Sequence, residues 1–269
     1  MTRTILLVGC GNMGFAMLQG WMALGGMRFH VVEPADALRA RAEQAGATAY
    51  ASPDQLPDDL APDLIFLAVK PQVMSEVAPQ YERFAGGPAT FVSVAAGITI
   101  ATLSDLLPGA TPIIRCMPNT PAAIGEGMMV SVANDLISED AKRLATELLA
   151  ASGETAWIDD ETLMDAVTAI SGSGPAYVLH FIECLSAAGA SLGLPSDLAG
   201  QLALQTVAGT GILAAGSDTP PSTLREQVTS PAGTTAAALD VLMGNRALEE
   251  LVKEAATAAR DRGIELGKG

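Results

Sequence analysis

The sequence predicts an α/β fold in which a doubly wound, mostly parallel sheet is followed by a second, all-helical C-terminal domain. Over residues 1–158, continuous apolar runs alternate with segments of helical apolar spacing, a pattern typical of parallel strands joined by helices. From about residue 159, strand-like patterns stop and long stretches rich in Ala, Gly and Leu begin. We therefore expect one domain over residues 1–158 and a helical domain over residues 159–269.

The strands and helices of the first domain alternate along the chain. Residues 4–9 form an apolar run that ends in glycine, as expected of a strand covered on both faces. Further strands are expected at 28–34, 63–71 and 89–97, and helices at 15–25, 38–47, near 72–84 and at 138–153. The segments 99–109, 111–125, 126–134 and 154–159 complete the alternation. Strands that alternate with helices imply right-handed crossovers and a doubly wound sheet.

The helices of the second domain are apolar around most of their circumference. No Lys or Arg lies between Arg143 and Arg225, and residues 198–216 carry no charge over about the length of a membrane span. Gln and Thr side chains and many Ala and Gly residues lower the hydropathy of that segment, so we expect a buried helix there. A domain of this size is too small to cover all of these helices. We therefore expect a second copy of the chain to cover them, at least in a homodimer.

Composition excludes several classes of partner. The 269 residues carry 15 Lys and Arg against 30 Asp and Glu, a net charge of -15, which disfavours nucleic acid and anionic membrane surfaces as partners. The three cysteines are widely spaced and odd in number, so we expect a reducing compartment, buried thiols and no metal site. The N-terminal residues lack the pattern of a signal peptide, and the predicted location is the cytoplasm.

A glycine-rich motif lies directly after the first predicted strand. Gly9, Gly11 and Gly14 have the G-x-G-x-x-G spacing and open a predicted helix. Such glycines permit a tight turn, the close approach of a pyrophosphate to the backbone, and close packing of helix on strand. The motif therefore predicts a Rossmann-type site for NAD or NADP. Glu33, at the end of the second strand, either accepts hydrogen bonds from the adenosine ribose or is an ordinary solvated acid.

Further candidate cofactor residues follow the later strands. Lys70 lies at the carboxyl end of the third predicted strand, where it faces either the cofactor or solvent. Small residues at 95–97 leave room for a flat nicotinamide against the backbone. Arg39 and Arg41 lie in the helix after Glu33, within a range from which they can approach an NADP phosphate. The set predicted from these motifs is Gly9, Cys10, Gly11, Asn12, Met13, Gly14, Glu33, Ala68, Val69, Lys70, Pro71, Ala95, Ala96 and Gly97.

The stretch VTSPAGTTAAAL at residues 228–239 combines a turn with a strong helix start. Ser230, Thr234 and Thr235 are good N-cap residues, and Gly233 gives the backbone freedom. The first N–H groups of a helix lack partners inside the helix, so this helix start can either be capped by a side chain or hold an anion. The residue pattern alone leaves both alternatives open.

Five motifs together resemble those of a known enzyme family. GCGNMG, AVKP, RCMPNTPA, SGSGPAY and VTSPAGTT occur in the order and spacing of pyrroline-5-carboxylate reductases, across essentially the whole chain. The resemblance implies reduction of the cyclic imine 1-pyrroline-5-carboxylate to L-proline by hydride from NADPH or NADH, the last step of proline biosynthesis. It also implies a helical domain that intertwines with its copy in a homodimer, and assembly of such dimers into a decamer.

The resemblance also assigns residues to the substrate site. It implies that the loop at 230–235 binds the substrate carboxylate and that Thr235 and Ser230 are its catalytic residues, with the Thr235 hydroxyl on the imine nitrogen. The substrate positions are Glu161, Ala232, Gly233, Thr234 and Thr235, and two further cofactor positions are Asn119 and Gln227. Family members usually have two glycines after the proline of this loop. Ala232 departs from that pattern, and alanine disfavours a positive φ.

Two other classes of function stay open on the sequence. Another imine reductase, or a short hydroxyacid dehydrogenase, would share the plan of two domains, and activity on the imine against 2-hydroxy acids separates these enzymes. A nucleotide-sensing binding protein would keep the glycines and lose the substrate loop, whereas TSPAGTT is intact here. His30 and His180 share no partner motif, so we expect both to be structural.

Overall fold

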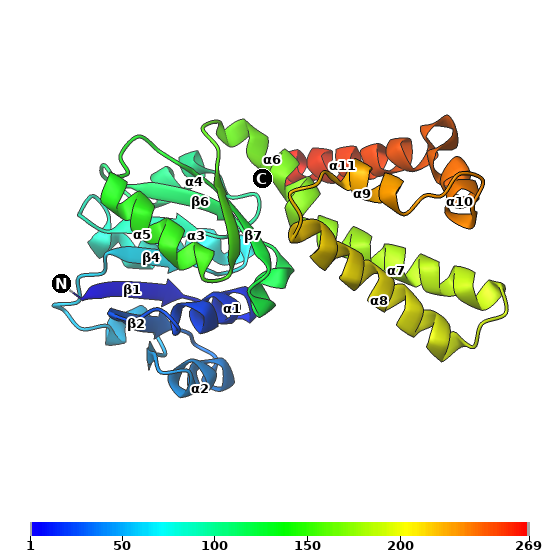
Figure 1. Cartoon of the computed structure of the whole chain (residues 1–269). Coiled ribbons are helices and arrows are strands. Elements are labelled where there is room, and N and C mark those ends of the chain that lie inside the picture. Colours follow the sequence, from blue (N-terminus) through cyan, green and yellow to red (C-terminus); the bar gives the residue numbers. More distant parts are fainter. Residues whose placement is uncertain (1, 268–269) are drawn as a thin grey trace. The chain divides into compact units, whose positions relative to one another are not determined.

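The computed structural model describes residues 2–267 and divides into two compact units (Figure 1). Unit 1 consists of Met1–Ser173 together with Ala259–Gly269, and unit 2 consists of Gly174–Ala258. The last strand ends at Trp157, next to the domain boundary predicted at 158/159, which stays a prediction. The short helical turns between that strand and residue 173 belong to unit 1 by their packing.

Unit 1 is built on one sheet of eight strands in the order β3-β2-β1-β4-β5-β6-β7-β8. All neighbouring strands pair in parallel except β6 and β7, which are antiparallel. The chain runs outward in both directions from β1, so the predicted doubly wound, mostly parallel fold is confirmed. The strands are β1 (Arg3–Val8), β2 (Met27–Val32), β3 (Thr48–Tyr50), β4 (Leu64–Leu67), β5 (Thr90–Ser93), β6 (Ile113–Met117), β7 (Gly127–Ala133) and β8 (Gly153–Trp157).

Helices cover both faces of this sheet. The side chains of β1 alternate, because Ile5 and Leu7 join an apolar cluster with α1, α2 and α5, whereas Leu6 and Val8 join a second cluster with α3 and α4. This burial on both faces explains the continuous apolar runs of the strands. The helices of unit 1 are α1 (Asn12–Trp21), α2 (Asp36–Gln44), α3 (Met74–Val77), α4 (Ile100–Leu106), α5 (Glu139–Ala150) and α6 (Met164–Val167).

Two local predictions differ from the structure. The single helix expected near residues 72–84 is wrong, because α3 is flanked by 3₁₀ turns at Pro71–Val73 and Ala78–Phe84. Pro79 has no N–H to donate, so regular α-helical bonding cannot continue through it. The sequence analysis also missed β3, whose three residues contain no apolar run.

The regular structure of unit 2 is helical over all of its described residues. α7 (Gly174–Ser191) and α8 (Ser196–Ala215) pack against each other, and a Cβ at Gly189 would lie 3.2 Å from the Ala199 side chain. Small residues therefore set the close approach of these two helices. They are followed by α9 (Pro221–Gln227), α10 (Thr234–Met243) and α11 (Ala247–Leu266), whose C-terminal part belongs to unit 1.

Apolar side chains of unit 2 are widely exposed in the single chain. Leu192, Ile212 and Val241 are 85%, 75% and 75% exposed. Within residues 2–267, α8 is the one helix that is long and apolar enough to cross a membrane, by length and composition only, and 11% of that apolar stretch is buried. The helix predicted over residues 198–216 is therefore largely exposed in the single chain, and its burial by a second copy stays a prediction.

Candidate cofactor and substrate sites

The glycine-rich loop joins β1 to α1 and leaves space for a ligand at one position. Gly9 has φ +87°, and a Cβ there would lie 2.8 Å from the carbonyl oxygen of Ala68, while a Cβ on Gly14 would overlap the carbonyl oxygen of Gly9. Gly11 differs, because a Cβ there would meet no atom of the described residues within 4 Å. Gly9 and Gly14 are needed for packing, and the open side at Gly11 is where a pyrophosphate can approach.

The start of α1 completes an anion site in this loop. Gly11 is the N-cap of α1, and no side chain among the described residues caps it. The first turn contains Asn12, Met13 and Gly14 and carries no acidic residue. The free N–H groups of the first turn and the positive end of the helix dipole both favour a phosphate there. The loop therefore fits the pyrophosphate of a dinucleotide.

Glu33 is held against this loop by its backbone. Its side chain is largely buried, with 7% of the residue exposed. Oε2 accepts the N–H of Cys10 at 2.7 Å, and Oε1 accepts the N–H of Ala35 at 3.0 Å. Two backbone donors fix the orientation of the carboxylate beside the glycine-rich loop, where the adenosine ribose of a Rossmann-bound dinucleotide lies. The alternative of an ordinary solvated acid is therefore wrong.

Arg39 and Arg41 are both engaged with the protein. Arg39 donates to the carbonyl oxygens of Glu33 at 3.1 Å and Pro34 at 3.2 Å, and it forms an ion pair of 2.6 Å with Asp36. Arg41 donates to the carbonyl oxygen of Cys10 at 2.9 Å and lies 3.9 Å from the centre of the Phe15 ring. The printed contacts hold both guanidinium groups in place, and the Nε of Arg41 has no hydrogen-bond partner among the described residues.

The other candidate cofactor loops follow β4 and β5, which neighbour β1 in the sheet. Ala68 continues the sheet by donating its N–H to the carbonyl oxygen of Val8 at 2.8 Å. Val69, the exposed Lys70 and Pro71 follow it at the carboxyl end of β4. After β5, Gly97 has φ +76°, and a Cβ there would meet no described atom within 4 Å. Together with Ala95 and Ala96, this open backbone matches the flat surface expected for a nicotinamide.

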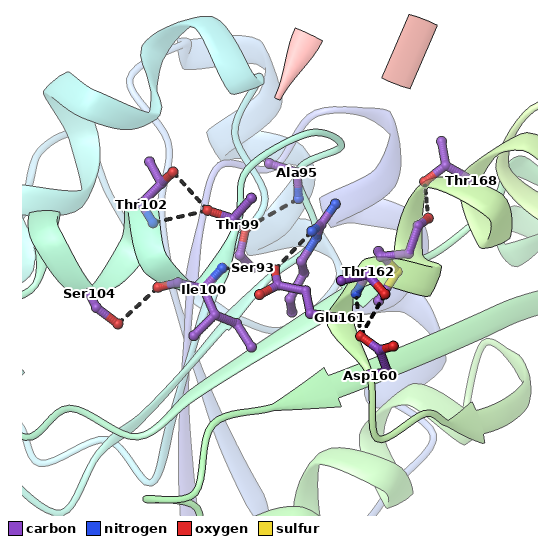
Figure 2. A network of polar contacts seen from close by, with 12 residues as sticks. Ser93, Ala95, Thr99, Ile100, Thr102, Ser104, Asp160, Glu161, Thr162 and Thr168 are labelled. Carbon is purple, nitrogen blue, oxygen red and sulfur yellow. Dashed lines mark hydrogen bonds and ion pairs between the residues drawn. The ribbon is translucent and has the colours of Figure 1, made fainter. Parts of the chain in front are cut away.

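Two predicted site residues take part in the internal bonding of unit 1. The Asn119 amide accepts the N–H of Met128 at 2.8 Å and donates to the carbonyl oxygen of Ser171 at 3.0 Å, so it braces the loop after β6. Glu161 accepts the Arg115 guanidinium at 2.8 Å (Figure 2). The sequence analysis missed Arg115, although a single arginine inside the apolar strand IIRCM is an unusual feature. Direct contacts of Asn119 with cofactor and of Glu161 with substrate stay predictions.

The cysteines and histidines of unit 1 show no sign of catalysis. Burial raises the pKa of the Cys10 thiol and raises the pKa of the Cys116 thiol to about 12. Both thiols are therefore protonated near neutral pH and are poor nucleophiles. Burial also lowers the pKa of His30, whose Nδ1 lies 3.1 Å from the Tyr50 hydroxyl. These residues have structural roles in the packing of the sheet.

The candidate substrate loop lies between α9, which ends at Gln227, and α10 in unit 2. Gly233 is the N-cap of α10, and no side chain in the described part of the chain caps this helix. Capping by Ser230, Thr234 or Thr235 is therefore wrong, because the extended Gly233 places Thr234 and Thr235 inside the helix. Ala232 adopts φ +57°, a left-handed conformation that alanine disfavours. The helix start presents uncapped N–H groups, as an anion site requires.

Comparisons with known proteins match both parts of the chain. The model of a family described as pyrroline-5-carboxylate reductase dimerisation matches residues 161–266, and that of the coenzyme F420-dependent NADP oxidoreductases matches residues 4–97. Pyrroline-5-carboxylate reductases of Pseudomonas aeruginosa and Synechocystis are 38% and 41% identical to this chain. The first alignment covers 99% of this chain and 98% of the relative, and the second covers 81% and 80%.

Two solved structures cover nearly the whole chain. A pyrroline-5-carboxylate reductase from Coxiella burnetii has a TM-score of 0.93 at 33% identity and covers 100% of both chains. The pyrroline carboxylate reductase of Plasmodium falciparum, solved with NADP bound, has a TM-score of 0.82 at 28% identity and covers 98% of both chains. The likeness therefore extends over both units and not over the dinucleotide fold alone.

Proposed function

This chain belongs to the pyrroline-5-carboxylate reductase family and reduces 1-pyrroline-5-carboxylate to L-proline with NAD(P)H, and from this premise we propose which residues bind the two reactants. The dinucleotide binds in unit 1, on the glycine-rich loop, Glu33 and the loops after β4 and β5. The imine substrate binds through its carboxylate at the start of α10. Gln227 and Asn119 complete the proposed set, and the assignment of Glu161 to the substrate rests on the sequence resemblance alone.

The uncapped start of α10 is the observation that carries the substrate assignment. Gly233 has no side chain to cap the helix, and the positive φ of Ala232 turns the chain into the first turn. A negative group placed there gains hydrogen bonds from N–H groups that otherwise lack protein partners. The substrate carboxylate supplies such a group.

Hydride transfer requires positioning more than activation. A protonated imine is already an electrophile, and the reduced nicotinamide supplies the hydride when bound. The protein holds the ring against the backbone of Ala95–Gly97 and leaves room for it at Gly97. Thr235 lies in the first turn of α10, where its hydroxyl orients the imine nitrogen or relays its proton. Ser230 lies in the same loop and assists this orientation.

The assembly follows from the exposed helices of unit 2. The matched family model is one of dimerisation, and apolar side chains along α7, α8 and α10 are exposed in the single chain. A homodimer removes this surface from water, which is favourable at about 25 cal/mol per Å² of apolar area. We propose further that dimers assemble into a decamer and that the enzyme works in the cytoplasm, without a membrane or nucleic-acid partner.

The proposal is tested by turnover. Purified enzyme is mixed with NADH or NADPH and 1-pyrroline-5-carboxylate, and oxidation is followed by the loss of nicotinamide absorbance while L-proline is quantified. We expect one proline for each reduced cofactor consumed and no oxidation without the imine. If the enzyme instead oxidises 2-hydroxy acids with the oxidised cofactor and does not reduce the imine, it is a hydroxyacid dehydrogenase.

A further inference from the structure

An ion pair between a buried arginine and a partly exposed glutamate lies beside the carboxyl end of β5 in unit 1. Arg115 on β6 is 4% exposed, and its Nη1 lies 2.8 Å from Oε1 of Glu161, whose side chain is 29% exposed. The same Oε1 accepts the backbone N–H of Ile100, the first residue of α4, at 2.9 Å. One carboxylate oxygen therefore joins three segments that are far apart in the sequence: β6, the start of α4, and the turn after β8. Figure 2 shows Glu161 beside Ile100.

The segment held by this carboxylate is 94–99, which joins β5 to α4. At its first end, the N–H of Ala95 lies 3.3 Å from the Ser93 hydroxyl. At its second end, Thr99 caps α4 by accepting the N–H of Thr102 at 3.0 Å, next to the bond from Ile100 to Glu161. Between these ends, a Cβ on Gly97 would meet no described atom within 4 Å, whereas the Gly97 carbonyl oxygen would lie 3.5 Å from a Cβ on Gly267. The segment is therefore fixed at its two ends and leaves space beside the Gly97 Cα in its middle.

Stability alone does not explain a charge at this position. Removing an arginine and a carboxylate from water is costly, and apolar residues of similar volume are often as stabilising as a buried ion pair. Arg115 also leaves its Nε without a partner among the described residues. The ion pair orients the Glu161 carboxylate, because Arg115 holds Oε1 where it accepts the N–H of Ile100.

We propose that Arg115 and Glu161 are positioning residues for hydride transfer, acting through the 94–99 segment. Glu161 fixes the start of α4 and so the backbone against which the nicotinamide lies, and Arg115 fixes Glu161. This inference rests on the proposed placement of the nicotinamide at Ala95–Gly97. In this role Glu161 acts on the cofactor through Ile100 and does not need to touch the imine.

Two double variants separate the roles of charge and of hydrogen bonding. Arg115→Met with Glu161→Gln removes both charges and keeps a side-chain oxygen for the N–H of Ile100. Arg115→Met with Glu161→Ala removes both charges and that acceptor. Both variants replace the pair by neutral groups, a change that folded proteins commonly tolerate. Arg143→Met, which removes an exposed guanidinium on α5 that pairs with Asp140, is the matched control.

Three quantities are measured on each variant: amide hydrogen exchange over 94–102 without ligand, the Kd for NADH and NADPH from their fluorescence, and the KM for the imine at saturating cofactor. We expect the Gln variant and the control to stay within about threefold of wild type in cofactor Kd. The Ala variant is expected to exchange the Ile100 amide faster and to bind cofactor at least tenfold more weakly, with the imine KM changed by less than threefold.

The alternatives give different results. If Glu161 is a direct substrate ligand, both double variants raise the imine KM tenfold or more and leave the cofactor Kd unchanged, which overturns the proposal. If the pair is merely structural, melting temperature falls while the cofactor Kd of the folded protein stays at the wild-type value, which also overturns it. Failure of the proposed function is seen separately, as a wild-type enzyme that binds cofactor but makes no proline.

Discussion

Replacing Glu33 with Ser is expected to shift the enzyme from NADH toward NADPH. The Glu33 carboxylate is buried and fixed by the N–H groups of Cys10 and Ala35, at 2.7 and 3.0 Å. It cannot turn away from a bound adenosine ribose without losing both hydrogen bonds. We therefore expect the carboxylate to accept the 2′-hydroxyl of NADH and to oppose the 2′-phosphate of NADPH.

The size of the shift is the sum of two effects. A hydrogen bond from the ribose to a charged acceptor contributes about 1.5 to 3 kcal/mol to NADH binding. Two unit charges about 4 Å apart repel by ~1 kcal/mol in water and by ~4 kcal/mol at an effective dielectric constant of ~20. Taking the lower value of each, Glu33→Ser changes the preference by about 2.5 kcal/mol, or roughly 60-fold toward NADPH.

The assay is the ratio of kcat/KM for NADPH to kcat/KM for NADH at fixed imine and ionic strength, with Kd values measured in parallel. Glu43→Ser is the matched control, because Glu43 is an exposed acid on α2, the helix that follows Glu33, and its loss changes net charge equally. Glu43→Ser should leave the ratio within about twofold. Asp36→Ser, which releases Arg39 from its ion pair, should favour NADPH without weakening NADH. A wild-type preference of tenfold or more for NADPH would refute this assignment of Glu33.

Three further changes test unit 2. Thr235→Ala should lower kcat/KM by about 10- to 100-fold through the loss of ~1 to 3 kcal/mol of transition-state binding. Thr234→Ala, a change at the neighbouring residue in the same turn, should alter kcat/KM by less than threefold. Equal effects of the two changes would contradict the role of Thr235. Ala232→Gly should stabilise the protein by roughly 0.5 to 1 kcal/mol in urea unfolding, because relief of ~1 to 2 kcal/mol of left-handed strain exceeds the ~0.4 to 1 kcal/mol of added entropy in the unfolded chain; a lower midpoint would show that φ at residue 232 is not left-handed in solution. Leu204→Lys places a charge on a residue that is 57% exposed in the single chain. If a second copy covers this residue, light scattering should show that the dimer dissociates. An unchanged dimer would show that α8 is not covered at this residue.

The fold could be predicted from the sequence wherever burial was uniform. β1, β4 and β5 are covered on both faces, so their apolar runs stand out from the flanking segments. The glycine-rich motif was equally direct, because its spacing reflects requirements of the backbone at Gly9 and Gly14. β3 and the turns around α3 could not be predicted in this way, since three residues or a local proline leave no periodic pattern.

The site was harder to predict where contacts join distant segments. Glu161 and Arg115 are 46 positions apart, and Glu161 also accepts the N–H of Ile100 at the start of α4. Neither residue has a local pattern that indicates its partner, and only the sheet register, which places Arg115 beside Ser93, brings them together. The sequence resemblance placed Glu161 near the substrate, whereas the geometry shows what it bonds to.

The hydroxyl residues of the loop before α10 left two alternatives open, a side-chain cap and an anion site. Three hydroxyl residues made a side-chain cap plausible, and the same residues allowed an anion site. The decision comes from the backbone, because Gly233 takes the N-cap position and moves Thr234 and Thr235 into the first turn. A helix whose cap position holds glycine and whose entry holds a left-handed alanine gives up about 0.3 kcal/mol of capping and ~1 to 2 kcal/mol of backbone strain, and its first N–H groups lack a side-chain cap. A ligand that satisfies those groups recovers the loss only when it binds, and the free energy then contributes to holding the imine in place for hydride transfer.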